Sequence, residues 1–431
     1  MAAMAKARTL RGGTFDEITA DLARDGKLTA AATRIARQLG EMKGAAMKLG
    51  QVISFIDVGL VPEQYRGALE ALQADAPPMP YRLVEEVITA ELGARPEDLF
   101  DFFSKVPIAS ASIGQVHMAH RGDEELVVKV QYPGVVKAVE ADLRNAALLA
   151  LLSRVAQKLL ADLVGDIDTK AIIDEVRDRV TEELDYRIEA HNQQTFAELY
   201  RDDEAIDIPA VIPELSRQRV ITSTYVDGMR WKAALAAPQD QRDKWGQAIS
   251  RFQWVSLFRH GFTNLDPHPG NYLFHEDGRV TFLDFGACQR YDTDQLARLS
   301  GLVVAARSDD QHVLDALVRL GLIRDATGFD GDLLVRPVRL AVEPAMAPQP
   351  FSFSRDFVAI QMRQALNLRF GRDQIRLLRK LDAVPELPMV LRITLGVAGI
   401  LSQLSASVHY QDVLDEALAG YAGYVPFAPT S

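Results

Sequence analysis

The sequence predicts an α+β fold with two lobes, a small lobe that contains a sheet and a larger lobe that is mostly helical. Two observations lead to this expectation. Helix-type patterns come first along the chain, short apolar and β-branched segments follow, and helix-type patterns return after residue 238. The chain also has 431 residues, too many for one ordinary hydrophobic core. We therefore expect two or three compact units.

The changes of pattern divide the chain into four expected segments. They are a disordered tail at 1–25, a helical extension at 26–104, a small lobe with inserted helices at 105–227 and a large helical lobe at 228–431. Within the extension, four helices are expected before any strand, because proline-rich stretches separate runs with helical periodicity. They cover 28–55, 63–74, 81–92 and 96–103.

The small lobe is expected to hold the strands. Apolar, β-branched segments predict strands at 113–119, 126–131, 211–213 and 219–225, with long helices at 135–161 and 166–200. The large lobe should be helical around one hairpin. Its expected helices are 240–260, 293–306, 309–320, 351–368, 372–382 and 388–407, and the prolines of 342–350 predict a linker.

Composition narrows the class of protein. Hydrophobic residues make up 48% and charged residues 25%, as in globular proteins, and the net charge of −11 argues against a nucleic-acid partner. Cys288 is the only cysteine, which excludes an intramolecular disulfide and fits a reducing compartment. No run reaches the ~18 to 20 apolar residues of a membrane span. We expect a cytoplasmic protein without a transmembrane helix, and association with a membrane surface stays open.

The stretch from Asp266 to Gly286 carries the chemistry. Asp266 and Asn271 are separated by four residues, and Asp284-Phe285-Gly286 follows a predicted hairpin of 271–274 and 279–283. This is the spacing of a kinase catalytic loop and its metal-binding turn. In phosphoryl transfer one carboxylate faces the proton of the nucleophile, while an amide and a second carboxylate hold Mg²⁺ on the nucleotide phosphates. We therefore expect ATP and Mg²⁺ at a cleft lined by Asp266, Asn271 and Asp284. The alternative is a surface loop followed by an unrelated turn.

Lys129 is the candidate phosphate ligand. It alternates with apolar neighbours in a predicted strand, so it projects to one face and can reach the α and β phosphates. A lysine that reaches solvent from the strand end is the alternative. Its partner is expected among the helical acids of 182–189. Asp185 and Glu189 share a helix face, whereas Glu183 lies about 200° from Asp185, so a regular helix cannot point all of them at one atom. A solvated acidic face is the alternative for any one of them.

Two further features stand upstream. No Gly-x-Gly-x-x-Gly loop precedes Lys129, and the chain instead carries Ala109, Ser110, Ala111 and Ser112. Because alanine does not share glycine's backbone freedom, a phosphate-covering loop here must use small side chains, hydroxyls and backbone N–H groups. Lys48 and Gln51 lie three residues apart in the first long helix and face the same way, which on its own indicates a helix contact.

Taken together, these motifs resemble the UbiB/ADCK (AarF/UbiB) family of atypical, kinase-like ATPases. The resemblance runs from about residue 41 to residue 290. It rests on seven motifs in order: Lys48-Leu49-Gly50-Gln51, the stretch 72–78, the Ala-rich loop through Gln115-Val116-His117, Val128-Lys129-Val130-Gln131 with Pro133-Gly134, Glu183-Leu184-Asp185-Tyr186, the loop from Asp266 to Asn271, and Asp284-Phe285-Gly286.

The resemblance implies a protein-kinase-like fold whose extension lies across the cleft where a protein substrate would dock. By this analogy Lys48 and Gln51 contact Glu183 and Asp185, and Glu189 is left to pair with Lys129. The hinge backbone at Tyr225 and Val226 would contact the adenine. The family also implies ATPase activity linked to isoprenoid-quinone biosynthesis and lipid homeostasis. The implied partners are an isoprenoid lipid or quinone precursor, a membrane surface and a biosynthetic enzyme.

The sequence departs from the family pattern at several points. Ser110 interrupts the usual all-alanine run, Asn264-Leu265 precedes Asp266 where His-Ala is common, and Thr224 stands where the hinge usually carries Glu. The C-terminal transmembrane helices of some bacterial members have no counterpart. Three functions stay open: a Mg²⁺-dependent ATPase or small-molecule kinase, a nucleotide-binding pseudokinase, and, ranked last, a protein kinase whose extension should exclude peptides.

Overall fold

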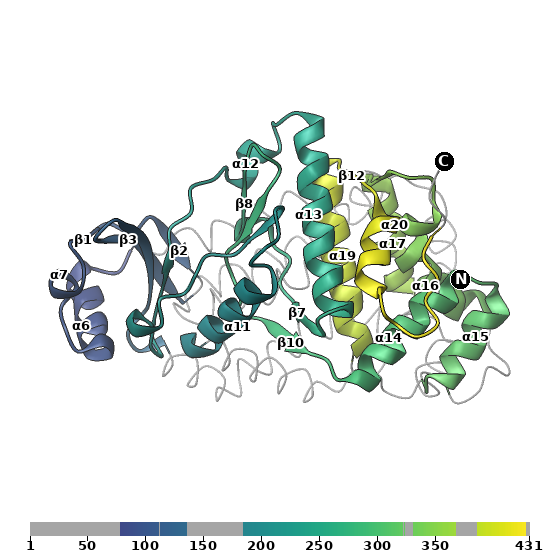
Figure 1. Ribbon diagram of the computed structural model, residues 1–431, viewed down its shortest axis with the longest axis horizontal. Coiled ribbons are helices and arrows are strands. Elements are labelled where there is room, and N and C mark those ends of the chain that lie inside the picture. Colours follow the sequence, from purple (N-terminus) through teal and green to yellow (C-terminus); the bar gives the residue numbers. More distant parts are fainter. Residues whose placement is uncertain are drawn as a thin grey trace, which may run out of the picture. The chain divides into compact units, whose positions relative to one another are not determined.

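The computed structural model describes residues 78–111, 113–135, 184–321, 323, 331–367 and 386–427 (Figure 1). These residues divide into two compact units. The described residues up to 135, together with 184–191 and 210–225, form the first unit, and 192–209 with everything after 225 form the second. The predicted helices at 28–55, 63–74 and 372–382, and the inserted helices before residue 184, lie outside the described residues.

An antiparallel sheet of five strands forms the centre of the first unit. Its strands are β1 (Phe102–Phe103), β2 (Ala109–Ala111), β3 (Gly114–Arg121), β4 (Glu124–Gln131) and β6 (Val220–Thr224). The order is β1-β3-β4-β6, and β2 also pairs with β3. One face of β4 carries Leu126, Val128 and Val130, all fully buried in the core with helix α6 (Tyr81–Leu92). Lys129 therefore projects from the opposite face.

Helix α6 has the predicted bounds, and Gly93 in the left-handed region (φ 79°) ends it. Helix α7 (Pro96–Leu99) is shorter than predicted, because Phe102 and Phe103 pair with β3 as an edge strand. The strand predicted at 211–213 is wrong. Val211 makes a single bridge to Ser223, and a 3₁₀ turn (Pro213–Leu215) follows, since Pro213 has no N–H to donate to a ladder.

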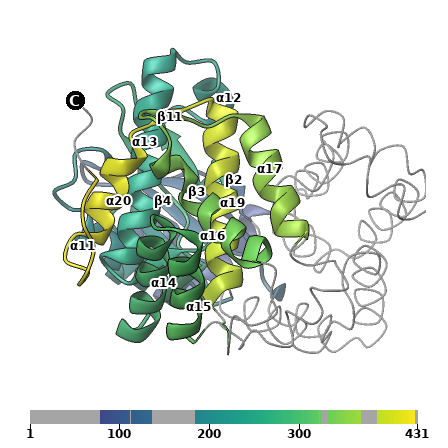
Figure 2. The same ribbon diagram turned by 90° about the vertical axis from the view of Figure 1, so that its right-hand side faces the viewer.

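Helix α11 (Tyr186–Leu199) begins in the first unit, and its second half belongs to the second unit. The second unit is built around helix α13 (Gln239–Phe258), which contacts β7 (Phe262–Asn264), β12 (Ser407–Val408) and the helices α19 (Glu386–Leu404) and α20 (Tyr410–Leu418). Figures 1 and 2 show α19 and α20 beside this central helix. Apolar residues on several sides of α13 are consequently buried.

Short strands hold the predicted catalytic stretch in the second unit. The predicted hairpin is present as β8 (Tyr272–Phe274) and β9 (Val280–Phe282), and β5 (Ile206–Asp207) pairs in parallel with β9. Strand β7 pairs with β10 (Cys288–Arg290). Residues 265–271 thus lie between β7 and β8, and Asp284-Phe285-Gly286 lies between β9 and β10.

Of the remaining helices of the second unit, those predicted at 293–306, 309–320 and 351–368 are present, whereas the helices at 231–234 and 331–346 were not predicted. These helices are α12 (Trp231–Ala234), α14 (Thr293–Ala306), α15 (Asp310–Arg319), α16 (Gly331–Met346) and α17 (Arg355–Asn367). Helix α14 has the predicted bounds, with Asp292 and Gln295 forming a capping box. The helix predicted from residue 351 begins later, because Phe351 and Ser352 pair with β12 as β11.

The linker predicted at 342–350 is wrong in its first half, because α16 continues to Met346. Val342 and Ala345 are buried, and α16 contacts α17 and α20. The stabilisation from this apolar packing outweighs the loss of the backbone hydrogen bond that Pro344 cannot donate. Among the described residues, no helix has the length and apolar character needed to cross a membrane.

Candidate active site

In the first unit, the structure brings Lys129 and Glu189 together. Lys129 Nζ on β4 lies 2.7 Å from Glu189 Oε1 and 2.9 Å from Glu189 Oε2 on α11. The two side chains are only 17% and 8% exposed, so solvent screens the pair weakly. The ring of Tyr186 lies 5.0 Å from Lys129 Nζ, which adds a cation–π contact. The lysine is therefore held in one place on its strand.

Ala109, Ser110 and Ala111 form a strand rather than an open loop. They pair with Val116, Gln115 and Gly114 of β3 in an antiparallel hairpin. Gly114 is needed there, since a Cβ atom at this position would lie 2.3 Å from the carbonyl oxygen of Val130 and 2.9 Å from Tyr186 Oη. Ser112 lies outside the described residues.

Of the four predicted gating residues, the structure describes only Asp185. Lys48, Gln51 and Glu183 lie outside the described residues. Asp185 is described, and its carboxylate accepts bonds from Arg187 Nε at 2.9 and 3.1 Å. The hydrogen bonds from Arg187 hold the pKa of Asp185 below its usual range. Asp185 also accepts from the backbone N–H of Arg187 (3.0 Å) at the start of α11.

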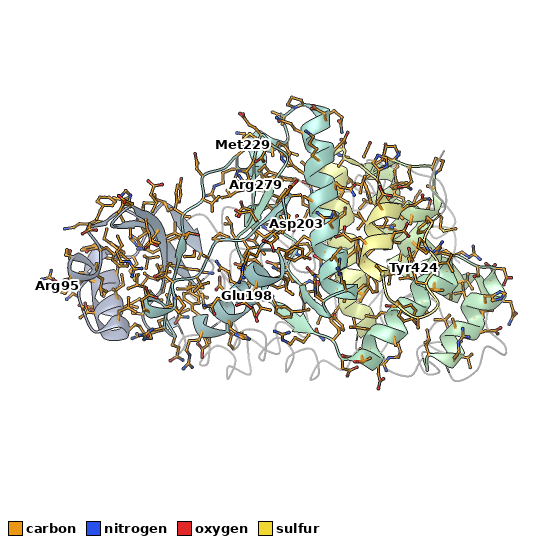
Figure 3. All side chains as sticks on the ribbon, viewed as in Figure 1. Arg95, Glu198, Asp203, Met229, Arg279 and Tyr424 are labelled. Carbon is orange, nitrogen blue, oxygen red and sulfur yellow. The ribbon has the colours of Figure 1, made fainter. Side chains whose placement is uncertain are left out.

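The hinge prediction concerns Tyr225 and Val226. The backbone N–H of Tyr225 donates to the carbonyl of Glu125 on β4 (2.8 Å), so this donor is engaged within the first unit. In the second unit, Met229 (Figure 3) exchanges two backbone hydrogen bonds of 2.9 Å with Phe274 of β8. The backbone of Tyr225 is therefore bonded within the first unit, and that of Met229 within the second.

In the second unit, Asn264 at the end of β7 organises the predicted catalytic loop. Its Oδ1 accepts from the backbone N–H of Asp266 (2.8 Å), and its Nδ2 donates to the backbone carbonyl of Asp284 (2.6 Å). Asn264 is 6% exposed, so these bonds form away from solvent. One buried side chain therefore links the loop of Asp266 to the turn of Asp284.

The side-chain amide of Asn271 is hydrogen-bonded to the carboxylate of Asp266. The Nδ2 atom of Asn271 donates to Asp266 Oδ2 (3.2 Å), and the backbone carbonyl of Asn271 accepts from Leu283 N–H (2.9 Å) next to Asp284. Because the amide nitrogen faces Asp266, the amide oxygen of Asn271 points away from that carboxylate. Asp284 Oδ1 in turn accepts from the backbone N–H of Gly286 (3.0 Å). The three predicted residues belong to one cluster.

The Asp266 carboxyl lies in an unusual electrostatic environment. Although its side chain is 31% exposed, the protein atoms packed around the carboxyl desolvate it and raise its pKa above the usual range, the neighbouring Asp284 raises it further, and His268 and Arg392 lower it. Arg392 comes from α19, with Nη2 3.7 Å from Asp266 Oδ1. The same helix packs Gly396 so tightly on the loop that a Cβ atom there would lie 2.6 Å from Pro267 Cγ.

The donor atoms of this cluster fit Mg²⁺. Carboxylate and amide oxygens are the hard ligands that this ion prefers, and it usually keeps waters and phosphate oxygens as its other ligands. A site with one carboxylate and one amide is therefore sufficient for a nucleotide-bound ion. In the described part of the chain, no group of three or more His, Cys, Asp or Glu side chains could hold a metal without a nucleotide.

Sequence reasoning missed three residues of this site. They are Asn264, Arg392 and Asn192, whose Nδ2 donates to the carbonyl of Phe285 (2.9 Å). Only Asn264 could be noticed in the sequence, because Asn264-Leu265 precedes Asp266 where family members commonly carry His-Ala.

A strand lysine paired with a helix glutamate, and an Asp-x₄-Asn loop joined to an Asp-Phe-Gly turn, define a protein-kinase-like protein. The ABC1 atypical kinase-like domain matches residues 71–317. The chain belongs to this atypical kinase-like family, which includes the COQ8, ADCK and UbiB proteins.

Several relatives are similar over most of this chain. "Atypical kinase COQ8, mitochondrial" of Saccharomyces cerevisiae is 30% identical over 396 residues, covering 90% of this chain and 76% of the relative. "Atypical kinase COQ8B, mitochondrial" of Rattus norvegicus is 32% identical over 328 residues, covering 75% and 60%. The chain thus spans less than two thirds of the rat protein's length.

A solved structure shares the fold. The structure of Rv3197 from Mycobacterium tuberculosis, determined as a complex with erythromycin, has a TM-score of 0.65 and 30% sequence identity, and the match covers 95% of this chain and 100% of that one. The α+β, kinase-like fold class predicted from the sequence is confirmed.

Proposed function

We propose that this chain is a Mg²⁺-dependent ATPase or small-molecule kinase. The observation that carries the proposal is the ion pair between Lys129 and Glu189, at 2.7 Å. Kinases use such a glutamate to position the lysine that binds the α and β phosphates of ATP. The loop of Asp266 and Asn271 and the turn of Asp284 contain the other polar groups that phosphoryl transfer requires.

Each residue has a distinct role in this proposal. Asn271 and Asp284 hold Mg²⁺, which neutralises charge on the phosphate oxygens when it is bound. Lys129 binds phosphate, and Glu189 keeps its ammonium group in place. Asp266 accepts the proton of the nucleophile or orients it, and a pKa raised above the usual range makes its carboxylate a stronger base than that of an ordinary aspartate.

Other predicted residues would complete the site. Their roles rest on the family resemblance. Backbone N–H groups and hydroxyls at Ala109, Ser110, Ala111 and Ser112 would cover the phosphates, Tyr225 and Val226 would contact the adenine, and Lys48, Gln51, Glu183 and Asp185 would gate access to the site. We expect such a gate to exclude peptides, which favours a small acceptor or water over a protein substrate.

We further propose a pathway from the family resemblance and a location from the composition of the chain. The acceptor or regulator would be an isoprenoid lipid or quinone precursor, presented at a membrane surface or by a biosynthetic enzyme. The protein would act in the cytoplasm and associate with the membrane from its surface, and nucleic acid would not be a partner.

A nucleotide-binding pseudokinase is the second candidate. It is favoured by the sequence from Ala109 to Ser112, because this segment lacks the glycines of the loop with which active kinases cover the phosphates. Such a protein would use ATP as a ligand that changes its conformation.

ADP release from Mg-ATP distinguishes the candidates. We would measure it with and without anionic vesicles and a soluble phenol that mimics a quinone head group, using Asp284→Asn as the blank. Asp277→Asn is the matched control, because the same chemical change falls in the exposed turn between β8 and β9. Turnover that Asp284→Asn abolishes and Asp277→Asn preserves supports the ATPase or kinase. Nucleotide binding without turnover in every condition supports the pseudokinase, and absence of binding contradicts both.

A further inference from the structure

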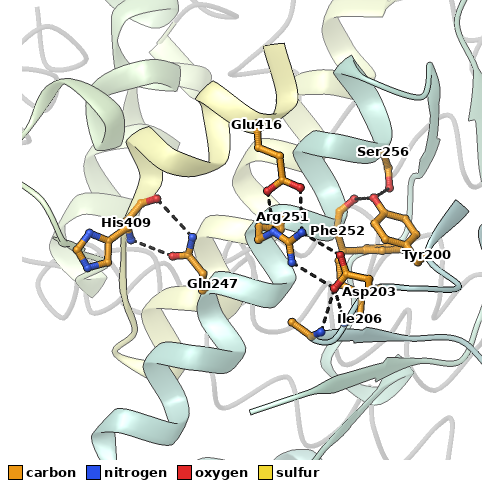
Figure 4. Close-up of polar contacts among 10 residues, drawn as sticks. Tyr200, Asp203, Ile206, Gln247, Arg251, Phe252, Ser256, His409 and Glu416 are labelled. Carbon is orange, nitrogen blue, oxygen red and sulfur yellow. Dashed lines mark hydrogen bonds and ion pairs between the residues drawn. The ribbon is translucent and has the colours of Figure 1, made fainter. Parts of the chain in front are cut away.

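A network of charged side chains in the second unit joins Glu416 of helix α20 through Arg251 to Asp203, just before strand β5 (Figure 4). Arg251 on α13 donates to Glu416 of α20 through Nε and Nη2, at 2.7 and 2.8 Å. It also donates to Asp203 through Nη1 and Nη2, at 3.2 and 2.8 Å. The guanidinium is planar and binds each carboxylate with two N–H groups, so it fixes three chain segments in one arrangement.

Asp203 passes this constraint to strand β5. Its Oδ1 accepts from the backbone N–H groups of Ala205 (2.9 Å) and Ile206 (3.0 Å), where β5 begins. Strand β5 pairs in parallel with β9, with Ile206 opposite Val280, and Val280 N–H donates to the carbonyl of Ala205 (2.9 Å). The position of Asp203 therefore sets the position of the first residue of β9.

Strand β9 leads directly to Asp284, two residues after its end. Its middle residue, Thr281, donates through Oγ1 to Asp207 Oδ2 on β5 (2.6 Å). Its last residue, Phe282, stacks on Phe252 with ring centroids 3.8 Å apart, and Phe252 follows Arg251 on α13. Side chains thus hold β9 to both β5 and α13, immediately before the predicted metal ligand.

We propose that Arg251 is a positioning residue that sets the place of Asp284 through Asp203, β5 and β9, and that Glu416 tunes the affinity for a divalent cation through Arg251. The inference rests on the proposed function, because it takes Asp284 as a metal ligand. Residue 416 lies beyond the segment 71–317 that matches the family domain. Helix α20 would therefore contribute to the geometry of the candidate metal site.

Isosteric variants test the network with the least risk to folding. Arg251→Ala would leave two carboxylates near one another without their shared partner, and we expect it to unfold the protein. Glu416→Gln and Asp203→Asn keep the shape of each arm and remove its charge. Gln247→Ala is the matched control. Gln247 on α13 accepts from the backbone N–H of His409 (2.9 Å) at the start of α20, so it joins the same two helices without contacting Asp203.

The readout is Mn²⁺ binding, followed by electron paramagnetic resonance in full-length protein saturated with a non-hydrolysable ATP analogue. We expect Glu416→Gln and Asp203→Asn each to weaken Mn²⁺ binding by up to about tenfold, the lower end of the effect of residues that contact a metal ligand directly, because both act on Asp284 only through intervening strands. Because both act through Arg251, the double variant should lose less than the product of the two effects. Without metal, hydrogen exchange at Val280 N–H should be faster in both variants. Gln247→Ala should lower the melting temperature and leave Mn²⁺ affinity unchanged.

Each contrary result has its own meaning. Wild-type protein that binds the analogue but shows the same Mn²⁺ affinity as Glu416→Gln overturns the positioning role and leaves the proposed function standing. Equal weakening by Gln247→Ala assigns the effect to docking of α20 and also overturns it. If the wild type binds neither Mn²⁺ nor the analogue, the proposed function fails and the tuning role of Glu416 fails with it.

Discussion

The side-chain amide of Asn264 donates a 2.6 Å hydrogen bond to the main-chain carbonyl of Asp284, twenty residues further along the chain. The same side chain accepts from the backbone N–H of Asp266. Asn264, two positions before Asp266, therefore ties the segment of the predicted base to that of the predicted metal ligand. A side chain of a different type can serve this purpose as long as it both donates and accepts.

Replacing Asn264 with alanine should affect stability and activity together. The carbonyl of Asp284 and the N–H of Asp266 would each lose a partner, and an unsatisfied buried group costs about 1–3 kcal/mol. We expect urea denaturation to show a loss in that range or above and Mg-ATP turnover to fall. Asn192→Ala removes a single bond to the carbonyl of Phe285 and is the control. An Asn264→Ala protein as stable as Asn192→Ala would contradict the bridging role.

The sequence predicted local features of the fold well and tertiary contacts poorly. Helices 81–92 and 293–306 were predicted with their observed bounds because caps and periodicity are encoded locally. The linker prediction at 342–350 failed because burial of Val342 and Ala345 depends on helices that pack against α16 from elsewhere in the chain. No local pattern reports such packing.

In the candidate site too, local features could be predicted from the sequence and tertiary contacts could not. The spacing of Asp266, Asn271 and Asp284 was readable because all three lie in one short stretch. The residues alone could not select the partner of Lys129 among the acids of 182–189, and only the family resemblance pointed to Glu189. Arg392 and Asn192 come from distant helices, and a bond to a backbone carbonyl such as that of Phe285 constrains no partner side chain.

The ion pair of Lys129 and Glu189 can be tested apart from any activity. Lys129→Met should remove the ammonium group that lies 2.7 Å from the carboxylate of Glu189, whose side chain is 8% exposed, and breaking a buried pair from one side costs about 3–5 kcal/mol. The double variant Lys129→Met/Glu189→Leu should be more stable than Lys129→Met alone, since neither charge of this pair remains. Urea denaturation of the single and double variants measures this, and a double variant that is the least stable of all would argue against a desolvated pair.

Two glycines of α19 provide a matched comparison. A Cβ atom at Gly396 would lie 2.6 Å from Pro267 Cγ, whereas one at Gly399 would meet nothing within 4 Å. We expect Gly399→Ala to stabilise the protein by up to about 1 kcal/mol, because alanine is the better helix former. Gly396→Ala should instead destabilise it by about 1–3 kcal/mol through overpacking.

The consequence of Gly396→Ala for activity follows from its position. Pro267 is the neighbour of Asp266, so the displaced ring should move the predicted base and lower Mg-ATP turnover. Gly399→Ala should leave turnover unchanged. Thermal melts and ADP release on the two variants check both statements, and equal behaviour of the pair would show that α19 does not support the loop.

The raised pKa of Asp266 makes a prediction about stability and pH. Because the pKa is higher in the folded than in the unfolded protein, the ionised form is disfavoured by folding, and the charge destabilises the protein above the folded pKa. Asp266→Asn should therefore raise the melting temperature at pH 7 while lowering turnover by about 100-fold or more. The gain should shrink as the pH falls through the folded pKa and vanish below the unfolded value of about 3.9.

Arg392 should set the acid limit of activity. Its guanidinium, 3.7 Å from Asp266 Oδ1, lowers the pKa of that carboxyl against the larger effect of burial. Removing the charge with Arg392→Gln should raise the pKa of Asp266 further, so that the base is protonated at higher pH. The acid limb of the kcat/KM profile for Mg-ATP should then move to higher pH, and Arg392→Lys, which keeps the charge, should restore it toward the wild-type position. If Gln and Lys shift the limb equally, the shift comes from altered packing of α19 and not from the lost charge.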